Sequence, residues 1–184
     1  MFWPQCPSSI SRWIGGRGSD LLLAGGDELH SGAGSDELNG ALGDDVLFGG
    51  ADDDKLIGGR GSDVLVGEDG NDEMKGGAGD DVLVGGDGDD ELSGGRGDDA
   101  FVYQSNQGES LGFYVIRDFR SGQDTLMVSD DLTLLFDDEV GFTRVRLTDA
   151  NESLVGTIDI LGNSFDSLSD VSQVNNQKID DLFA

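Results

Sequence analysis

The chain has 184 residues and carries 38 Asp and Glu against 11 Lys and Arg, a formal net charge of -27. Such a surface repels nucleic acid and anionic lipid, so we expect its partners to be cations. With only 36% apolar residues, the cation-free chain is expected to lean towards disorder. The sequence has no run of about 18 apolar residues, which predicts no membrane span.

We expect residues 1–14 to form a poorly ordered lead. They lack the basic and apolar regions of a Sec-type signal peptide. They also contain the only cysteine, Cys6, which has no partner for an internal disulfide and is expected to be an incidental thiol.

Residues 15–102 repeat with a period of nine, as in "GGAGDDVLVGGDGDDELSGGRGDDAFV" (76–102). The unit is G-G-x-G-x-D-x-U-x, where U is a large apolar residue. Position 6 is Asp27, Asp36, Asp45, Asp54, Asp63, Asp72, Asp81, Asp90 and Asp99. Position 8 is Leu29, Leu38, Leu47, Leu56, Leu65, Met74, Leu83, Leu92 and Phe101. Asp20 is out of phase, so the first unit is expected to fray. A flexible acidic linker does not require apolar residues in phase with the acids, so the pattern argues against a linker.

The period describes a coil with two short strands per turn. Glycines at positions 1, 2 and 4 permit positive φ and tight turns. The x-U-x triplet is a minimal strand whose middle side chain points inward. Identical positions then stack every 18 residues at roughly 4.8 Å. The apolar residues therefore form two inner columns, one with Leu29, Leu47, Leu65, Leu83 and Phe101, the other with Leu38, Leu56, Met74 and Leu92.

The same stacking places one aspartate above another, and such carboxylates repel each other unless a cation lies between them. Carboxylate and carbonyl oxygens with flexible geometry favour Ca²⁺ over Mg²⁺. Pairs 18 residues apart give up to about seven sites, from Asp27/Asp45 to Asp81/Asp99. We expect carbonyls from positions 2 and 4 to complete them. These are Gly32, Gly34, Gly43, Gly50, Gly59, Gly61, Gly70, Gly77, Gly79, Gly86, Gly88, Gly95 and Gly97. Ala41 and Glu68 at position 2, and Asp52 at position 4, depart from the pattern.

These repeats resemble the RTX (repeats-in-toxin) family of haemolysin-type calcium-binding nonapeptides. The resemblance implies an all-β fold, a right-handed parallel β-roll with Ca²⁺ in its turns. It also implies export by a type I secretion system and folding outside the cell.

The outward positions 7 and 9 differ between the two sheets. One sheet presents an apolar surface that includes Val64, Val66, Val82 and Val84, here called the Val face. The other presents mostly polar residues, such as Glu37, Lys55 and Glu73. A large apolar face is rarely left in water, so we expect the C-terminal region, a partner domain or a polysaccharide to cover it. Strand propensity of valine alone is the alternative.

Residues 103–184 are expected to form a small β-rich cap. Residues 111–130 predict strand, turn and strand, and 142–161 predict a hairpin. The run I-x-D-F-x-x-G-x-D-x-L resembles the segment after the repeats of serralysin-type proteases, which makes Asp118 and Asp124 possible Ca²⁺ ligands or ordinary turn acids. The last residues, Asp181 to Ala184, resemble a C-terminal type I secretion signal.

No catalytic motif accompanies the repeats. The only histidine, His30, lies at an outward position, and the sequence has neither H-E-x-x-H nor G-x-S-x-G. We therefore expect a noncatalytic, secreted, extracellular module that folds on Ca²⁺. Two alternatives remain, the C-terminal part of a larger secreted hydrolase (serralysin-type protease or lipase) and a polysaccharide-binding module. Four arginines would either contact an acidic glycan or pair with nearby acids, namely Arg117, Arg120, Arg144 and Arg146.

Overall fold

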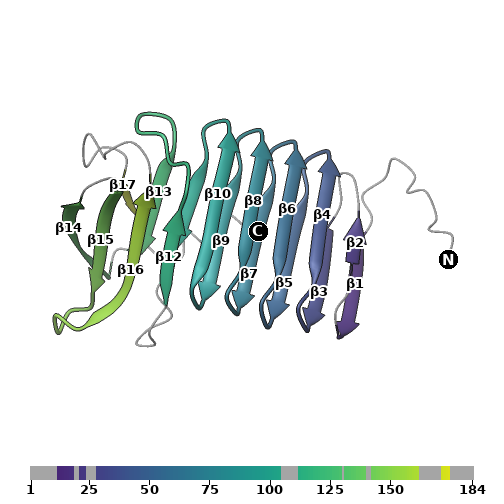
Figure 1. Ribbon diagram of the computed structural model, residues 1–184, viewed down its shortest axis with the longest axis horizontal. Helices are drawn as coiled ribbons and strands as arrows, with labels where there is room; N and C mark the ends of the chain where they lie inside the picture. Colours follow the sequence, from purple (N-terminus) through teal and green to yellow (C-terminus); the bar gives the residue numbers. More distant parts are fainter. Residues whose placement is uncertain are drawn as a thin grey trace, which may run out of the picture.

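The computed structural model describes residues 12–18, 21–23, 28–104, 112–129, 131–139, 142–161 and 171–174. Every regular element in these ranges is a β-strand, and the strands coil into a parallel β-solenoid with two facing sheets (Figure 1). The predicted all-β roll is therefore confirmed. Cys6, Asp20, Asp27 and the last residues, from Asp181 on, lie outside the described residues. The described part of the chain contains no helix suited to crossing a membrane.

Successive strands alternate between the sheets. The first sheet has the order β1 (Arg12–Arg17), β3 (Glu28–Ala33), β5 (Val46–Ala51), β7 (Val64–Asp69), β9 (Val82–Asp87), β11 (Ala100–Tyr103), β13 (Thr125–Ser129) and β17 (Val171–Val174). The second has the order β14 (Thr133–Glu139), β15 (Phe142–Thr148), β16 (Leu154–Leu161), β12 (Phe113–Ile116), β10 (Asp90–Arg96), β8 (Glu73–Ala78), β6 (Lys55–Arg60), β4 (Glu37–Leu42) and β2 (Leu21–Leu23).

The register of the roll follows the 18-residue period. Val46 pairs with Val64, and Val64 with Val82, in parallel strands. The nine position-8 residues, Leu29 to Phe101, are all fully buried between the sheets, as the inner columns predict.

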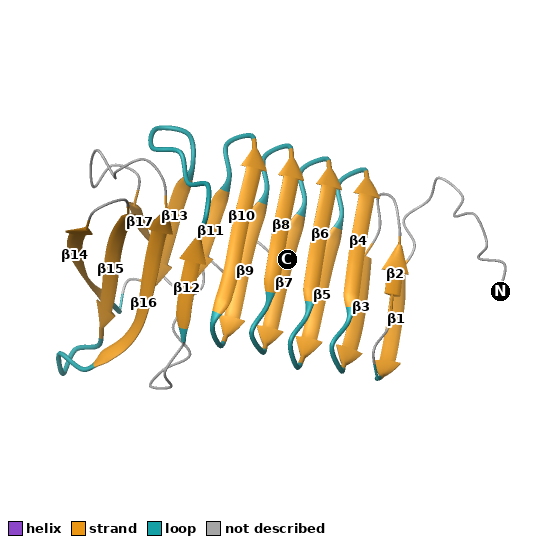
Figure 2. Cartoon of the chain, in the orientation of Figure 1, coloured by secondary structure: helices purple, strands orange, loops and turns teal. Residues whose placement is uncertain are grey.

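The strands are longer than the expected triplets. They run through positions 1 to 3 because these residues continue the pairing, as Gly50 with Glu68 shows. Only positions 4 to 6 form the turns, which connect the strands along both edges of the roll (Figure 2).

The parallel stack continues beyond the repeats. β12 adds to β10 and β13 adds to β11, so the two strands predicted within 111–130 lie in opposite sheets. Beyond β12, β16, β15 and β14 extend the second sheet, and the last two pairings are antiparallel. The predicted hairpin over 142–161 is confirmed as β15 and β16. Figure 1 shows these strands at the end of the solenoid opposite β1.

The outer faces differ as the sequence predicts. On the first sheet, Val84 and Val102 are buried and pack with Val66, Val82 and Met127 in a cluster separate from the inner core. On the second sheet, Lys55 Nζ contacts Glu37 Oε1 at 2.9 Å, one turn away. The Val face is thus partly buried within this chain, and the opposite face carries paired charges.

Candidate metal centre

The position-6 aspartates lie at the ends of the turns and point into the roll. Each of the eight described members, Asp36 to Asp99, is no more than 5% exposed. Because strands alternate between sheets, these aspartates form two columns. Asp45, Asp63, Asp81 and Asp99 make one column, and Asp36, Asp54, Asp72 and Asp90 make the other.

One oxygen of each carboxylate is used within the fold. The backbone N–H of Asp45 donates to Oδ1 of Asp63 at 2.8 Å, and that of Asp63 donates to Oδ1 of Asp81 at 2.9 Å. The same bond joins each described pair 18 residues apart in both columns. Through its Oδ1, each aspartate therefore holds the turn 18 residues before it at a fixed spacing.

The other oxygen has no such role. Oδ2 of Asp54, Asp63, Asp72, Asp81 and Asp90 is buried and accepts no hydrogen bond. Burial, with a smaller contribution from neighbouring carboxylates, raises the pKa of Asp54, Asp63 and Asp90 to about 6 and that of Asp72 and Asp81 to about 7. A buried charged oxygen without a partner is costly, so this row of atoms favours a bound cation.

Position 1 provides the space beside this oxygen. A Cβ built on Gly58 would lie 2.5 Å from Asp63 Oδ2 and 2.7 Å from the carbonyl oxygen of Gly76 in the next turn. Gly49 stands in the same relation to Asp54 and Gly67. Gly49 and Gly58 do not adopt the positive φ that glycine permits at position 1. Here glycine is required because any side chain would fill the gap at the carboxylate.

Positions 2 and 4 do adopt positive φ. Gly59 and Gly61 have φ of 116° and 132°, and the departures Ala41, Asp52 and Glu68 keep the conformation at 71°, 78° and 77°. Their carbonyls face the next turn. A Cβ on Gly59 would lie 2.5 Å from Ala41 O, and one on Gly61 would collide with Gly43 O.

Several oxygen atoms therefore lie between two stacked turns. The lower turn provides carbonyls from positions 2 and 4 and the Oδ2 of position 6, and the upper turn adds the carbonyl of position 1. Within the ranges described above, no three carboxylate, imidazole or thiol side chains converge on one point. A mixed set of carboxylate and carbonyl oxygens fits Ca²⁺, which accepts six to eight hard oxygen ligands.

A second ladder at position 5 was not predicted. The backbone N–H of Ser62 donates to Asp44 Oδ1 at 2.8 Å, and that of Asp98 donates to Asp80 Oδ1 at 2.9 Å. Here the acceptor lies in the preceding turn, so the polarity is opposite to that of position 6. The sequence signal was the recurrence of Asp, Asn or Ser at position 5, whose side chains bond readily to nearby backbone.

Two further acids were proposed as ligands. Asp118 accepts hydrogen bonds from Ser93 Oγ at 2.7 Å and from the N–H groups of Gly94 and Gly95 at 3.0 Å, so its carboxylate binds residues within β10. Asp124 Oδ1 accepts from the N–H of Asp99 at 3.1 Å, as a position-6 aspartate would. Asp124 thus continues one column beyond the repeats.

The remaining candidates are one histidine and four arginines. His30 stacks on Phe48, with ring centroids 4.4 Å apart, and bonds Glu28 at 2.7 Å. The four arginines all pair with acids: Arg117 with Glu91, Arg120 with Asp99 and Asp124, Arg144 with Asp159, and Arg146 with Asp137. The ion-pair alternative therefore accounts for these arginines.

Comparisons with known proteins agree with the repeat assignment. A family model described as "RTX calcium-binding nonapeptide repeat (4 copies)" matches residues 30–65 and 66–101. No curated protein matches the chain.

Solved structures also resemble the chain. The AlgE6R3 subunit of the Azotobacter vinelandii mannuronan C5-epimerase is 27% identical, with 70% of this chain and 77% of that chain covered and a TM-score of 0.32. The AlgE6R2 subunit is 25% identical, with 69% of this chain and 92% of that chain covered and a TM-score of 0.37. The extracellular lipase LipA of Serratia marcescens is 14% identical, with 91% of this chain and 41% of the lipase covered and a TM-score of 0.40. This chain therefore spans less than half of that lipase. Residues 30–101 are therefore identified as RTX calcium-binding nonapeptide repeats.

Proposed function

We propose that this protein is a noncatalytic, secreted module that folds when it binds Ca²⁺ outside the cell. The observation that carries the proposal is the row of buried Oδ2 atoms that accept no hydrogen bond, at Asp54, Asp63, Asp72 and Asp81. A fold that buries so many unpaired carboxylate oxygens needs cations to be stable.

The free energies support this coupling. Without Ca²⁺, repulsion between stacked acids adds to the conformational entropy lost on folding, about 1–2 kcal/mol per residue for the backbone alone. The inner core of the roll is only one side chain wide on each sheet, so its apolar burial is small. Binding energy for a metal whose site is absent from the unfolded chain becomes folding energy.

We assign the ions to the gaps between stacked turns. Each gap would use the position-6 carboxylate and the carbonyls of positions 2 and 4 of the lower turn, with the position-1 carbonyl of the upper turn as a further ligand. Six of the proposed pairs, from Asp36/Asp54 to Asp81/Asp99, lie in the described residues. The gaps that border Ala41, Asp52 and Glu68 have the least regular turns.

Secretion fits the same chemistry. Extracellular calcium modules bind in the range of about 10⁻⁴–10⁻³ M. Cytosolic Ca²⁺ would leave such a chain unfolded and competent for type I export, and external Ca²⁺ would fold it after exit. The noncatalytic role is supported by the contacts of His30, which bonds Glu28 and stacks on Phe48.

Calcium titration tests the proposal. In chelator we expect a coil-like circular dichroism spectrum, and in millimolar CaCl₂ a cooperative rise of β signal. MgCl₂ at the same concentration is the control and should be ineffective, because Mg²⁺ demands a tighter octahedral site. A chelated protein with the full β spectrum would refute the proposal.

A further inference from the structure

The loop before Asp124 is a tenth repeat turn in altered form. Residues 119–124, "FRSGQD", align with G-G-x-G-x-D, and β13 pairs with β11 in the register of the roll, Phe101 with Leu126. Gly122 keeps the positive φ of position 4, at 79°, and Asp124 holds position 6. Phe119 and Arg120 replace the glycines of positions 1 and 2.

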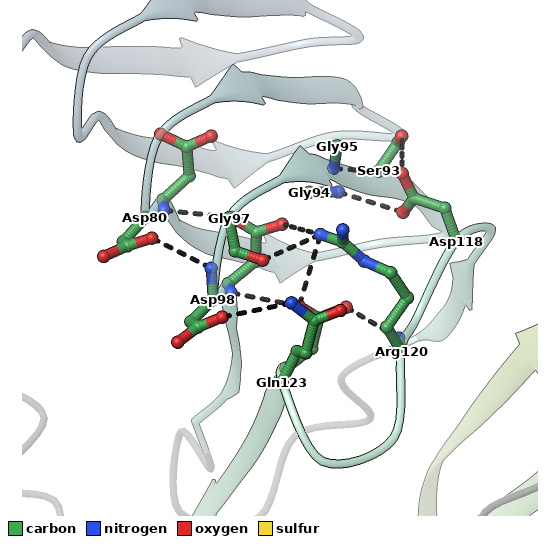
Figure 3. A network of polar contacts seen from close by, with 12 residues as sticks. Asp80, Ser93, Gly94, Gly95, Gly97, Asp98, Asp118, Arg120 and Gln123 are labelled. Atoms are coloured by element: carbon green, nitrogen blue, oxygen red, sulfur yellow. Dashed lines mark hydrogen bonds and ion pairs between the residues drawn. The ribbon is translucent and has the colours of Figure 1, made fainter.

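The gap between this loop and the loop of Asp99 contains a side chain. Arg120 Nη2 donates to the carbonyl oxygen of Gly97 at 2.7 Å and lies 3.5 Å from Asp99 Oδ2 and 3.7 Å from Asp124 Oδ1. Figure 3 shows the guanidinium turned towards Gly97. Gly97 is a position-4 residue and Asp99 a position-6 residue, so Arg120 contacts the same oxygen types that border the gaps below.

The two carboxylates at this gap are inaccessible to water. The side chains of Asp99 and Asp124 are 0% and 1% exposed. The backbone N–H of Arg120 also donates to Asp124 Oδ2 at 2.7 Å, which fixes the loop around the charged group. A buried pair of acids therefore has one cation between them, supplied by the chain.

We propose that the guanidinium of Arg120 takes the place of a calcium ion between the loops of Asp99 and Asp124. The inference rests on the proposed calcium sites in the lower turns. In this proposal, the last gap of this column has the oxygen atoms of a calcium site, but the guanidinium of Arg120 occupies it.

The other column ends in a comparable way. Tyr114 pairs in register with Asp90, so it stands where the next aspartate of that column would be. Its hydroxyl donates to the carbonyl oxygen of Gly86, a position-2 residue, at 3.0 Å. A Cβ on Gly85 would lie 2.5 Å from Tyr114 Cζ, so the tyrosine ring fills the space beside Asp90. Both columns are therefore closed by side chains at the C-terminal end of the repeats.

The number of bound ions tests the role of Arg120. Calcium per chain is counted by isothermal titration calorimetry and native mass spectrometry for the full chain and for Arg120→Ala and Arg120→Gln. Each neutral variant should bind one Ca²⁺ more than the unaltered protein, because the freed oxygens of Gly97, Asp99 and Asp124 then accept the ion. Arg117→Ala is the matched control. Arg117 is half exposed and pairs with Glu91 on the outer face, so its removal should leave the count unchanged.

Three outcomes would overturn the inference. The first is that the neutral variants fold in CaCl₂ with an unchanged ion count, and the second is that Arg117→Ala gains an ion as well. The third is that both neutral variants stay unfolded at saturating CaCl₂, which would show that calcium does not substitute for the guanidinium. If the unaltered protein bound no Ca²⁺, the proposed function itself would be wrong, and this result differs from all three.

Discussion

The repeat roll and the C-terminal strands bury acids in different ways. In the roll, Asp63 is fully buried and its Oδ2 accepts no hydrogen bond. In the C-terminal hairpin, Asp159 is also buried, yet Arg144 donates to its two oxygens at 2.7 and 2.6 Å. The roll therefore leaves carboxylate oxygens for an external cation, whereas the C-terminal strands use a cation of the chain.

Raised pKa values are concentrated in the roll, and beyond the repeats burial also raises the pKa of Asp124, which continues one column. Burial raises the pKa of Asp72 and Asp81 to about 7. Beyond the repeats, hydrogen bonds from the N–H groups of Ser153 and Asn151 lower the pKa of Asp149. Dependence on metal and on pH should thus be concentrated in residues 30–101, and Arg120 marks where it ends.

Acidification should have the largest effect, because it acts on all the ion gaps of the roll at once. The raised pKa values mean that the metal-free fold binds protons more tightly than the unfolded chain. This contribution to stability is complete below the unfolded pKa, near 4, and is lost as the pH rises through about 6–7. The chelated chain should therefore gain β signal between pH 8 and pH 5.

Protons and calcium should also compete. Between pH 7.5 and pH 5.5 we expect the calcium midpoint of folding to rise by more than about tenfold, since one pKa unit corresponds to tenfold. Circular dichroism at fixed ionic strength measures both effects. A calcium midpoint independent of pH over this range would contradict the assignment of the aspartates as ligands.

Removal of one carboxylate should affect a single gap. Asp72→Asn removes the charge at one buried Oδ2, and a charged hydrogen-bond partner contributes about 1.5–3 kcal/mol. We expect one Ca²⁺ fewer per chain and a calcium midpoint raised about tenfold. Asp69→Asn removes the same charge from an exposed position-3 residue and is the control. Equal effects of both variants would indicate that net charge alone sets the calcium dependence.

Filling a gap should weaken binding while keeping the carboxylate. Gly58→Ala places a methyl group against Asp63 Oδ2 and Gly76 O, and overpacking of this kind costs about 1–3 kcal/mol. Gly16→Ala is the control, since nothing lies within 4 Å of its Cβ position. Calorimetry should show weaker calcium binding for Gly58→Ala only. Unchanged affinity would show that position 1 does not border the ion.

Relief of backbone strain should have the smallest effect. Glu68 has a φ of 77°, a conformation that costs a residue with a side chain about 1–2 kcal/mol. Glu68→Gly should therefore raise the thermal midpoint in CaCl₂ by a few degrees. Glu73→Gly, in the regular part of β8, should lower it, and a decrease for both variants would mean that Glu68 is not strained.

The sequence predicted the roll because its period is regular. Nine aspartates and nine apolar residues in phase determine both columns, the buried core and the difference between the two outer faces. The use of each oxygen was not predictable, because it depends on how a carboxylate rotates between two turns. The space required at position 1, the ladder at position 5 and the place of Arg120 all depend on such side-chain geometry. The arginine also lies in a loop outside the period, because Asp124 follows Asp99 by 25 residues rather than 18. The nine-residue pattern therefore does not identify this loop as a repeat turn.

Hydrogen exchange measured by mass spectrometry tests the central claim most directly, because it resolves the two regions in one experiment. In CaCl₂ the amides of residues 46–101 should be protected, and in chelator at pH 7.5 they should exchange as in an unfolded chain. Addition of calcium should change these residues far more than β15 and β16. Equal protection of residues 46–101 with and without calcium would contradict the account.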